Sequence, residues 1–312
     1  MRKTSSRFVV AAVLSMSLVT AACGSDPDTT NDPVSTSPIA VDVYGTLFTL
    51  DARPERIVSL SPTATEVLFA VGAGAQVIAA DEFSDYPEDA PTTTLSGFTP
   101  NVEAILAFEP DLVVASFNPG DLVASLAAAD VPTLILDAAV DLDDLMYQLE
   151  VLAAVTGNPG AAIPVIVDLE ERIATAVART PALETPITYF HLLDDSLITA
   201  TSDTFIGAVY GLFGLVNIAD AADPDGTSFG YPQLSAEYLV EADPDLIFLA
   251  NMDVASFREL PVLGGLRAVD EDGVIELLPD VASRFGPRIV DFVEQVAEVV
   301  ARFATSMLVL VR

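Results

Sequence analysis

The sequence predicts an α/β fold in which two Rossmann-like lobes, each with a central sheet, are joined by one long α-helix. Three observations support this prediction. Apolar runs of strand length alternate with segments of helical periodicity, a unit made of a helix, Pro-Asp and a strand occurs twice, and a long helical stretch separates the two occurrences. The chain of 312 residues is also longer than the ~100 to 200 residues usual for one domain.

The first segment has the pattern of an export signal. Basic residues precede an apolar run, residues 8–22, that is short for a membrane span, and Cys23 follows directly. Cys23 is the only cysteine in the chain, so no internal disulfide is possible. The run from Leu18 to Gly24 resembles a bacterial lipoprotein signal, which implies that residues 1–22 are removed and that Cys23 is lipidated. The alternative is an ordinary signal peptide with an incidental cysteine.

Residues 23–38 have the composition of a flexible tether. They are rich in Asp, Thr, Ser and Pro and contain few apolar residues, so they cannot build a core. Ordered structure is expected from Ile39, where apolar residues on both sides of Gly45 predict a small hairpin.

Residues 39–140 are predicted to form the N-terminal lobe. Ser61-Pro62-Thr63 supplies a turn and a helix cap directly after the first buried strand. In chain order, the pattern predicts a strand at 57–60, a helix that ends near Gly72 and is followed by a strand, a helix between Asn101 and Pro110, and strands at 112–115 and 133–136.

Residues 141–180 have helical periodicity, interrupted at Gly157-Asn158-Pro159. The pattern restarts with Pro159 near a helix start and then places apolar residues three and four apart up to Val177. A helix over about 159–179 would be ~30 Å long, which is enough to connect two lobes as a stiff rod.

Residues 181–312 are predicted to form the C-terminal lobe, because they repeat the alternation of helices and strands of the first half. The unit Glu103 to Pro110 followed by Asp-Leu and a strand matches Glu237 to Pro244 followed by Asp-Leu and a strand. This repeat predicts two equivalent lobes related by a pseudo-twofold axis. The unit is common in α/β proteins, so chance recurrence is the alternative. The apolar end, residues 307–311, fits either a strand or a helix.

The composition excludes several functions. With 46 acidic against 13 basic residues and a net charge of -33, nucleic acid is a poor partner. We interpret the excess of acidic residues as a sign of a soluble surface that suits a salty or extracellular setting. The alternative is that the acidic residues form a ligand site.

Catalytic and cofactor motifs are also missing from the sequence. His191 is the only histidine and Cys23 lies in the tether, which leaves no pattern for a nucleophilic triad or a transition-metal site. Gly72-Ala-Gly74 follows a helix and lacks a third glycine, so it is a helix end and not a dinucleotide loop. We therefore expect no catalytic residue, no metal and no cofactor, and His191 to be a satisfied core residue.

A family resemblance rests on several segments together. Residues 56–66 (Arg-Ile-Val-Ser-Leu-Ser-Pro-Thr-Ala-Thr-Glu), the two Pro-Asp-Leu units, residues 204–207 and Phe285-Gly-Pro-Arg288-Ile resemble the helix-linked binding proteins of iron-siderophore, haem and cobalamin ABC importers. The resemblance covers about residues 41–303. It implies two lobes with a ligand cleft between them and transport in place of catalysis.

Within this class the chain looks most like the vitamin B12-binding type, and the resemblance implies the ligand-binding residues. These are Phe83, Phe98, Phe117, Tyr231, Asp280 and Arg284. Aromatic faces suit a large flat ligand, and a charged pair suits its polar edge. Tryptophans of that type are replaced here by Phe98, Phe117 and Tyr231. The alternative for each aromatic residue is loop packing, and Arg288 is expected to pair with a carboxylate.

The repeat also places Glu103 and Glu237 at equivalent positions. The resemblance implies that this pair docks on arginines of the two membrane subunits of the importer. The alternative is that both are ordinary glutamates favoured at helix starts by the helix dipole.

These observations predict a monomeric, lipid-anchored extracytoplasmic binding protein at the outer face of the cell membrane. The expected ligand is cobalamin or a related corrinoid, with a ferric siderophore or haem as alternatives, and the expected partner is the membrane part of an ABC importer. The rivals from other classes are a surface or signalling lipoprotein without transport and an enzyme on a two-lobe frame.

Overall fold

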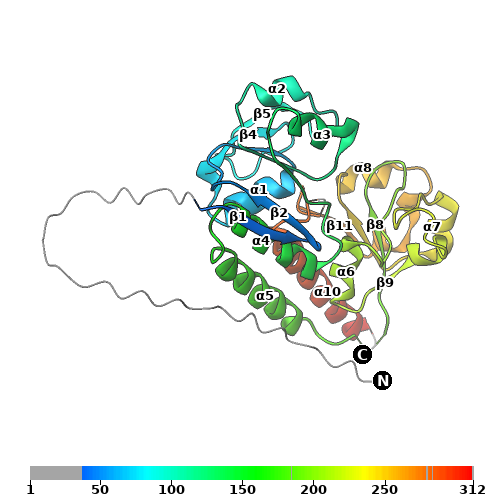
Figure 1. Cartoon of the computed structure of the whole chain (residues 1–312). Helices are drawn as coiled ribbons and strands as arrows, with labels where there is room; N and C mark the ends of the chain where they lie inside the picture. The colour runs from blue at the N-terminus through cyan, green and yellow to red at the C-terminus, as the bar shows by residue number, and fades with distance from the viewer. Residues whose placement is uncertain (1–36, 184, 279, 283, 311–312) are drawn as a thin grey trace, which may run out of the picture. The chain divides into compact units, whose positions relative to one another are not determined.

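The computed structural model describes residues 37–310 apart from 184, 279 and 283. The predicted signal peptide, Cys23 and almost all of the predicted tether lie outside the described residues. Within them, the predicted two-lobe α/β fold is confirmed, with one parallel sheet in each half (Figure 1).

An antiparallel ribbon opens the fold and confirms the predicted hairpin. Its strands are β1 (Ile39–Val43) and β2 (Thr46–Leu50), paired from Ile39 with Leu50 to Val43 with Thr46. Tyr44 and Gly45 form the turn with φ of 50° and 82°, a conformation that glycine adopts without strain. The Tyr44 hydroxyl donates to Asp144 Oδ1 at 2.6 Å and fixes the ribbon to helix α4 (Leu142–Val155).

The N-terminal lobe has a five-stranded parallel sheet in the order β5-β4-β3-β6-β7. The strands are β3 (Ile57–Leu60), β4 (Val77–Asp81), β5 (Thr92–Leu95), β6 (Leu112–Ala115) and β7 (Thr133–Ile135). The helices of the lobe are α1 (Pro62–Ala70), α2 (Val102–Leu106) and α3 (Leu122–Ala127). The prediction expected a strand after the first helix but gave no bounds for it, and β4 is that strand. It missed β5, a mostly polar Thr-Thr-Thr-Leu edge strand that gives little hydrophobic signal.

The C-terminal lobe repeats this design with a four-stranded parallel sheet in the order β11-β10-β8-β9. The strands are β8 (Thr188–Leu192), β9 (Val216–Asn217), β10 (Leu246–Leu249) and β11 (Val274–Glu276). The helices are α6 (Phe205–Gly211), α7 (Ala236–Ala242), α8 (Val254–Glu259) and α9 (Arg267–Asp270). Successive residues of β10 point to opposite faces of the sheet. Phe248 belongs to one buried apolar cluster, and Ile247 and Leu249 belong to another, so both faces of the sheet are covered.

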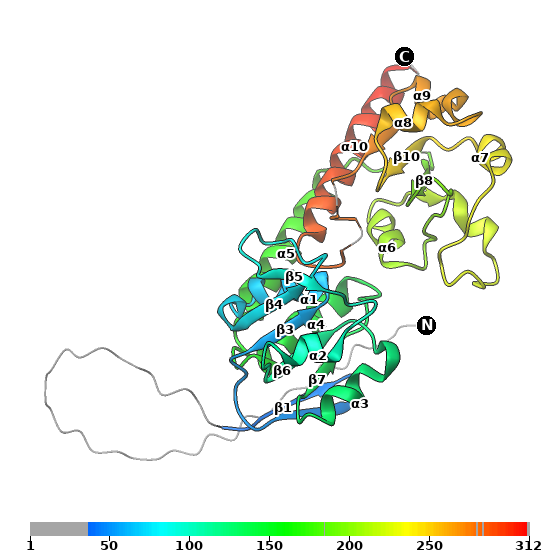
Figure 2. The ribbon, with the colours of Figure 1, turned by 90° about the horizontal axis from the view of Figure 1, so that it is seen from above.

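Two long helices connect the lobes. Helix α5 (Ala162–Arg179) is the predicted connector, but it begins three residues after Pro159 because residues 158–161 form a turn in which the Ala161 amide donates to the Asn158 carbonyl. Helix α10 (Ile289–Leu310), whose backbone includes the apolar end up to Leu310, packs along α5 (Figure 2).

Arg172 joins the two helices, with ion pairs to Asp291 at 2.8 Å and to Glu294 at 2.9 Å. One buried apolar cluster runs from Val67 of α1 through Leu169 of α5 to Tyr210 of α6 and Val293 of α10. The lobes therefore share packed side chains along the helix pair, which stiffens the connection.

No helix in the described part of the chain has a run of apolar residues long enough to cross a membrane.

Candidate ligand-binding site

Three exposed phenylalanines gather at one edge of the N-terminal sheet, and we call Phe83, Phe98 and Phe117 the phenylalanine platform. They follow β4, β5 and β6, and parallel strands end at the same edge of a sheet. The ring centroids of Phe83 and Phe98 are 5.9 Å apart, and those of Phe98 and Phe117 are 5.5 Å apart. The side chains nevertheless remain 48%, 63% and 40% exposed.

This exposure is informative because the three rings form one apolar patch. Single exposed apolar side chains are normal on a protein surface, whereas contiguous aromatic patches mark binding surfaces. The structure therefore brings together three residues that the sequence analysis proposed as ligand contacts.

Close packing beneath the platform requires a glycine. A Cβ atom added to Gly97 would lie 2.4 Å from the Leu60 carbonyl oxygen at the end of β3. Any side chain at this position would push the segment that carries Phe98 away from the sheet.

A buried carboxylate supports the Phe83 turn. Asp81 is only 1% exposed, and its Oδ1 accepts from the Phe83 amide at 3.2 Å and from the Ser84 hydroxyl at 2.8 Å. Burial raises the pKa of Asp81, and the hydrogen bonds from Ser84 and Phe83 offset this only in part. Sequence reasoning did not identify Asp81, because nothing in its neighbourhood marks it as buried.

Arg284 lies among carboxylates of both lobes. Its guanidinium is almost fully buried and pairs with Asp85, with Asp280 at 3.2 Å and with Glu66 at 3.8 Å. The hydrogen bond from Arg284 lowers the pKa of Asp85. The predicted pair of Asp280 and Arg284 thus exists, and it reaches the loop that carries Phe83.

Arg288 has the structural role that was predicted for it. Its guanidinium holds buried Glu66 of α1 with two hydrogen bonds, at 3.0 Å and 2.5 Å. It also lies over the ring of Tyr86, 4.0 Å from the ring centre. Arg284 and Arg288 therefore tie the segment before α10 to the N-terminal lobe.

Tyr231 lies on a loop of the C-terminal lobe and is partly exposed. The Tyr231 amide donates to Ser228, and the preceding Gly230 carbonyl accepts from the Thr201 amide at 2.8 Å. Burial raises the pKa of the Tyr231 hydroxyl. The neighbouring Phe229, which sequence reasoning missed, is 90% exposed.

Glu103 and Glu237 occupy matching positions in the two lobes. Each is the second residue of its helix, and the preceding caps, Asn101 and Ser235, both accept from a backbone amide of the first turn. Both glutamates are exposed. Hydrogen bonds from its own amide and from Ser235 lower the pKa of Glu237.

Comparison with known proteins identifies the family. The sequence profile of the family described as "Periplasmic binding protein" matches residues 57–281. The chain belongs to this family.

Two curated relatives of this periplasmic binding protein have names that state a ligand. The cobalamin-binding protein of Halobacterium salinarum strain R1 is 35% identical over 213 residues, which cover 66% of this chain and 56% of that relative's length. The vitamin B12-binding protein of Vibrio cholerae serotype O1 is 33% identical over 249 residues, 78% of this chain and 87% of the relative.

Solved structures with the same fold include proteins with different ligands in their titles. The periplasmic vitamin B12 binding protein BtuF of Vibrio cholerae has a TM-score of 0.69 at 30% identity and covers 81% of this chain and 98% of its own. The periplasmic haem-binding protein RhuT of Roseiflexus sp. RS-1 has a TM-score of 0.68 at 25% identity, with coverage of 80% and 99%. The fold therefore supports the class, and the ligand must be argued from the site.

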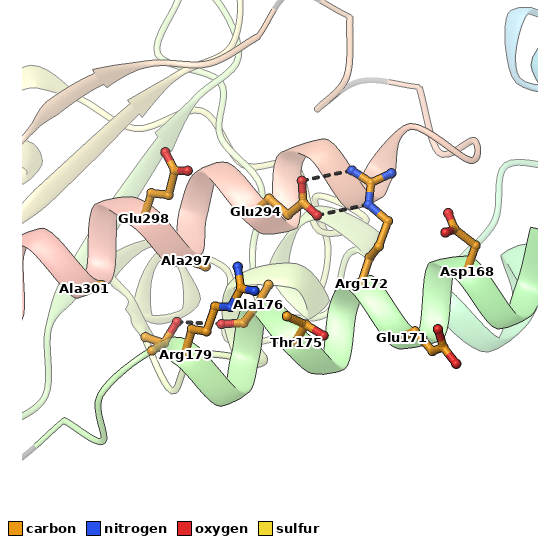
Figure 3. Close-up of a pocket in the computed structure, with 11 residues that line it drawn as sticks. Asp168, Glu171, Arg172, Thr175, Ala176, Arg179, Glu294, Ala297, Glu298 and Ala301 are labelled. Atoms are coloured by element: carbon orange, nitrogen blue, oxygen red, sulfur yellow. Dashed lines mark hydrogen bonds and ion pairs between the residues drawn. The ribbon is translucent and has the colours of Figure 1, made fainter.

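The protein also has a groove of about 510 Å³ between α5 and α10 (Figure 3). Its lining is charged and contains no aromatic side chain, and Arg172 in it is already paired with Glu294. This groove has no surface for a large flat ligand, so we place the candidate site at the phenylalanine platform.

His191 is buried, as predicted, but only one of its two ring nitrogens has a hydrogen-bond partner. Its Nδ1 lies 2.8 Å from the Tyr210 hydroxyl, whereas Nε2 has no hydrogen-bond partner. Burial lowers the pKa of His191 to about 3, so the ring is neutral in the fold. Among the residues that the structure describes, no three or more His, Cys, Asp or Glu side chains are grouped so that they could hold a metal ion.

Proposed function

We propose that this protein is a lipid-anchored, extracytoplasmic solute-binding protein of an ABC importer that captures cobalamin or a related corrinoid and delivers it to the permease. The observation that carries this proposal is the phenylalanine platform. Three exposed rings, of which Phe98 contacts the other two, offer a rigid apolar surface that suits one face of a large flat macrocycle. Tyr231 would contact the ligand from the C-terminal lobe.

The charges near the platform favour a ligand without strong negative charge. Arg284 is compensated by Asp85, Asp280 and Glu66, and Arg288 by Glu66. The only lysine of the chain is Lys3, in the predicted signal peptide. Haem propionates and anionic siderophores would have to bind beside two arginines that are already paired, whereas the amide-rich periphery of a corrin needs no cation.

The names of the relatives agree with this choice. The curated relatives described above are named for cobalamin or vitamin B12. Haem-binding neighbours share the fold at lower sequence identity. We take a ferric siderophore or haem as the alternative ligand of the same class.

Binding is proposed to close the lobes only slightly. The shared core along α5 and α10 and the buried ion pair between Arg288 and Glu66 resist a large hinge motion.

Isothermal calorimetry tests the ligand. Cyanocobalamin, a ferric hydroxamate siderophore and haem are titrated separately into the purified chain without residues 1–22. We expect saturable binding of cyanocobalamin and weaker or no binding of the other two. Tight binding of haem or the siderophore alone would assign the alternative ligand, and binding of none would favour a surface or signalling lipoprotein. Turnover of any ligand would indicate an enzyme.

Glu103 and Glu237 are proposed to dock on arginines of the two importer subunits. Their matched, exposed positions at helix starts fit a partner with twofold symmetry. In cells that depend on corrinoid uptake, the double variant E103A/E237A should abolish uptake while the purified variant keeps its cobalamin affinity. The exposed pair E109A/E241A serves as the matched control. Loss of affinity with normal docking would contradict the assignment.

The organisation of the chain is proposed from the sequence. Residues 1–22 are the signal peptide, residues 23–38 tether lipidated Cys23 to the body, and the lobes span 39–140 and 181–312 on either side of the helical segment 141–180. We propose that the body works as a monomer. Replacing Cys23 with serine should release the protein from the membrane fraction, and retention of the variant there would contradict the lipid anchor.

A further inference from the structure

We propose that Asp81 is a positioning residue whose buried carboxylate holds the phenylalanine platform in its ligand-binding arrangement. This inference rests on the proposed function, because it concerns the affinity for the ligand of the platform. Asp81 does not reach the surface and would act through Phe83 and Phe98.

The carboxylate contacts both segments that carry the first two rings. Its Oδ1 accepts from the Phe83 amide at 3.2 Å, which fixes the turn after β4. Its Oδ2 borders Gly97, since a Cβ atom added there would lie 3.1 Å from Oδ2, and Gly97 immediately precedes Phe98. One side chain thus sets the spacing between two neighbouring loops.

A chain of buried hydroxyls connects Asp81 to the rigid part of the lobe. The Ser84 hydroxyl donates to Asp81 Oδ1 and lies 2.8 Å from the Thr65 hydroxyl, which lies 2.8 Å from Ser59 Oγ. Thr65 belongs to α1 and Ser59 to β3. The Phe83 turn is therefore anchored to the centre of the sheet, and interactions of this kind reduce the ordering cost of binding.

The second anchor of the same turn is weaker. Asp85 pairs with Arg284, but the Asp85 side chain is 62% exposed. Ion pairs that water reaches contribute little. The buried hydrogen bonds of Asp81 are therefore expected to dominate the position of the Phe83 ring.

Variants of Asp81 test the proposal by calorimetry with cyanocobalamin. D81A removes both acceptor oxygens and should weaken binding about tenfold. D81N keeps one oxygen acceptor and should bind within about threefold of the wild type. D111A is the matched control, because Asp111 accepts from the amides of Glu55 and Arg56 at the opposite end of β3. It should lower the melting temperature and leave the affinity unchanged.

The outcomes separate the two proposals. If the wild type does not bind cyanocobalamin, the proposed function fails. If the wild type binds and D81A binds equally well, the inference about Asp81 is overturned. An equal loss of affinity in D81A and D111A would also overturn it, since general destabilisation would then explain the effect. Should D81A not fold, S84A replaces it, and wild-type affinity in S84A would count against the proposal.

Discussion

The two lobes are alike at the amino ends of their strands and different at the carboxyl ends. In both, the residue before the Pro-Asp unit has a left-handed backbone, with φ of 49° at Glu109 and 37° at Asp243. Asp111 accepts from amides at the start of β3, and Asp245 accepts from the amide and hydroxyl of Thr188 at the start of β8.

An arginine completes the unit in each lobe. Arg56 donates to the carbonyls of Phe108 and Glu109, and Arg267 donates to the Asp243 carbonyl and the Asp245 carboxylate. The two arginines come from different places in their lobes, Arg56 from the residue directly before β3 and Arg267 from α9. In both lobes an arginine therefore stabilises the segment around the Pro-Asp unit, and this arginine comes from a different part of each lobe.

The carboxyl ends differ in chemistry. In the N-terminal lobe they carry the phenylalanine platform, whereas in the C-terminal lobe they border a groove of about 490 Å³ lined by Asp194, Asp253 and Glu276 among others. The repeated unit therefore builds each sheet, whereas the aromatic residues of the proposed ligand surface lie mainly on the N-terminal lobe and are not part of that unit. The N-terminal lobe supplies a rigid aromatic surface and the C-terminal lobe a tyrosine on a loop.

The largest expected difference between the two Pro-Asp units is in their contribution to the free energy of unfolding. Asp245 is mostly buried and holds both Thr188 and Arg267, so D245A should lower the free energy of unfolding by about 3 kcal/mol. Asp111 is exposed, and D111A should cost about 1 kcal/mol. Urea unfolding of both variants measures the difference. Equal costs would mean that burial does not distinguish the two units.

The second difference should appear in ligand affinity. Phe98 lies between the other two rings of the platform, so F98A should weaken cyanocobalamin binding by about 2 kcal/mol, or roughly 30-fold. Y231A should weaken it by less, about fivefold, because less of the Tyr231 side chain is exposed for contact, 39% against 63% for Phe98. Calorimetry of the two variants decides this order, and a larger loss in Y231A would reverse the assignment of the main contact surface.

The sequence predicted those parts of the fold and site that depend on local pattern. The strands at 57–60, 112–115 and 133–136 are apolar runs next to turn residues, and the structure confirms them within one residue. Each phenylalanine of the platform follows shortly after a strand, which is why parallel pairing brings the rings together. Strand β5, by contrast, is stabilised by pairing with β4 and has no apolar run of its own.

The remaining features depend on contacts between distant residues. Arg284 meets Asp85 across 199 positions, and Arg288 meets Glu66 across 222. No periodicity encodes such pairs. The burial of Asp81 likewise follows from the packing of the loops above it, so its role became visible only in three dimensions.

A further expected effect concerns the buried histidine of the C-terminal lobe, which has no counterpart in the N-terminal lobe. The pKa of His191 is about 3 in the fold against 6.5 for an ordinary histidine. Between these values only the unfolded chain takes up the proton. The neutral ring therefore contributes fully above pH 6.5, and stability is lost by about 1.4 kcal/mol per unit as the pH falls below it.

The variant H191L isolates this contribution. Neutralisation of the many carboxylates changes the stability of both proteins alike, so the difference between their free energies of unfolding should shift in favour of H191L from pH 6.5 to pH 4.5. Urea unfolding at several pH values measures it. A difference that stays constant with pH would show that His191 is not buried as a neutral ring.

Hydrogen exchange with and without cyanocobalamin tests the central claim that the ligand is held between the two lobes. The account predicts slower amide exchange in three segments of the N-terminal lobe, around Phe83, Phe98 and Phe117, and in residues 228–232 of the C-terminal lobe. Exchange in the repeated units around Asp111 and Asp245 should not change. Protection confined to one lobe, or located along the groove between α5 and α10, would contradict the account.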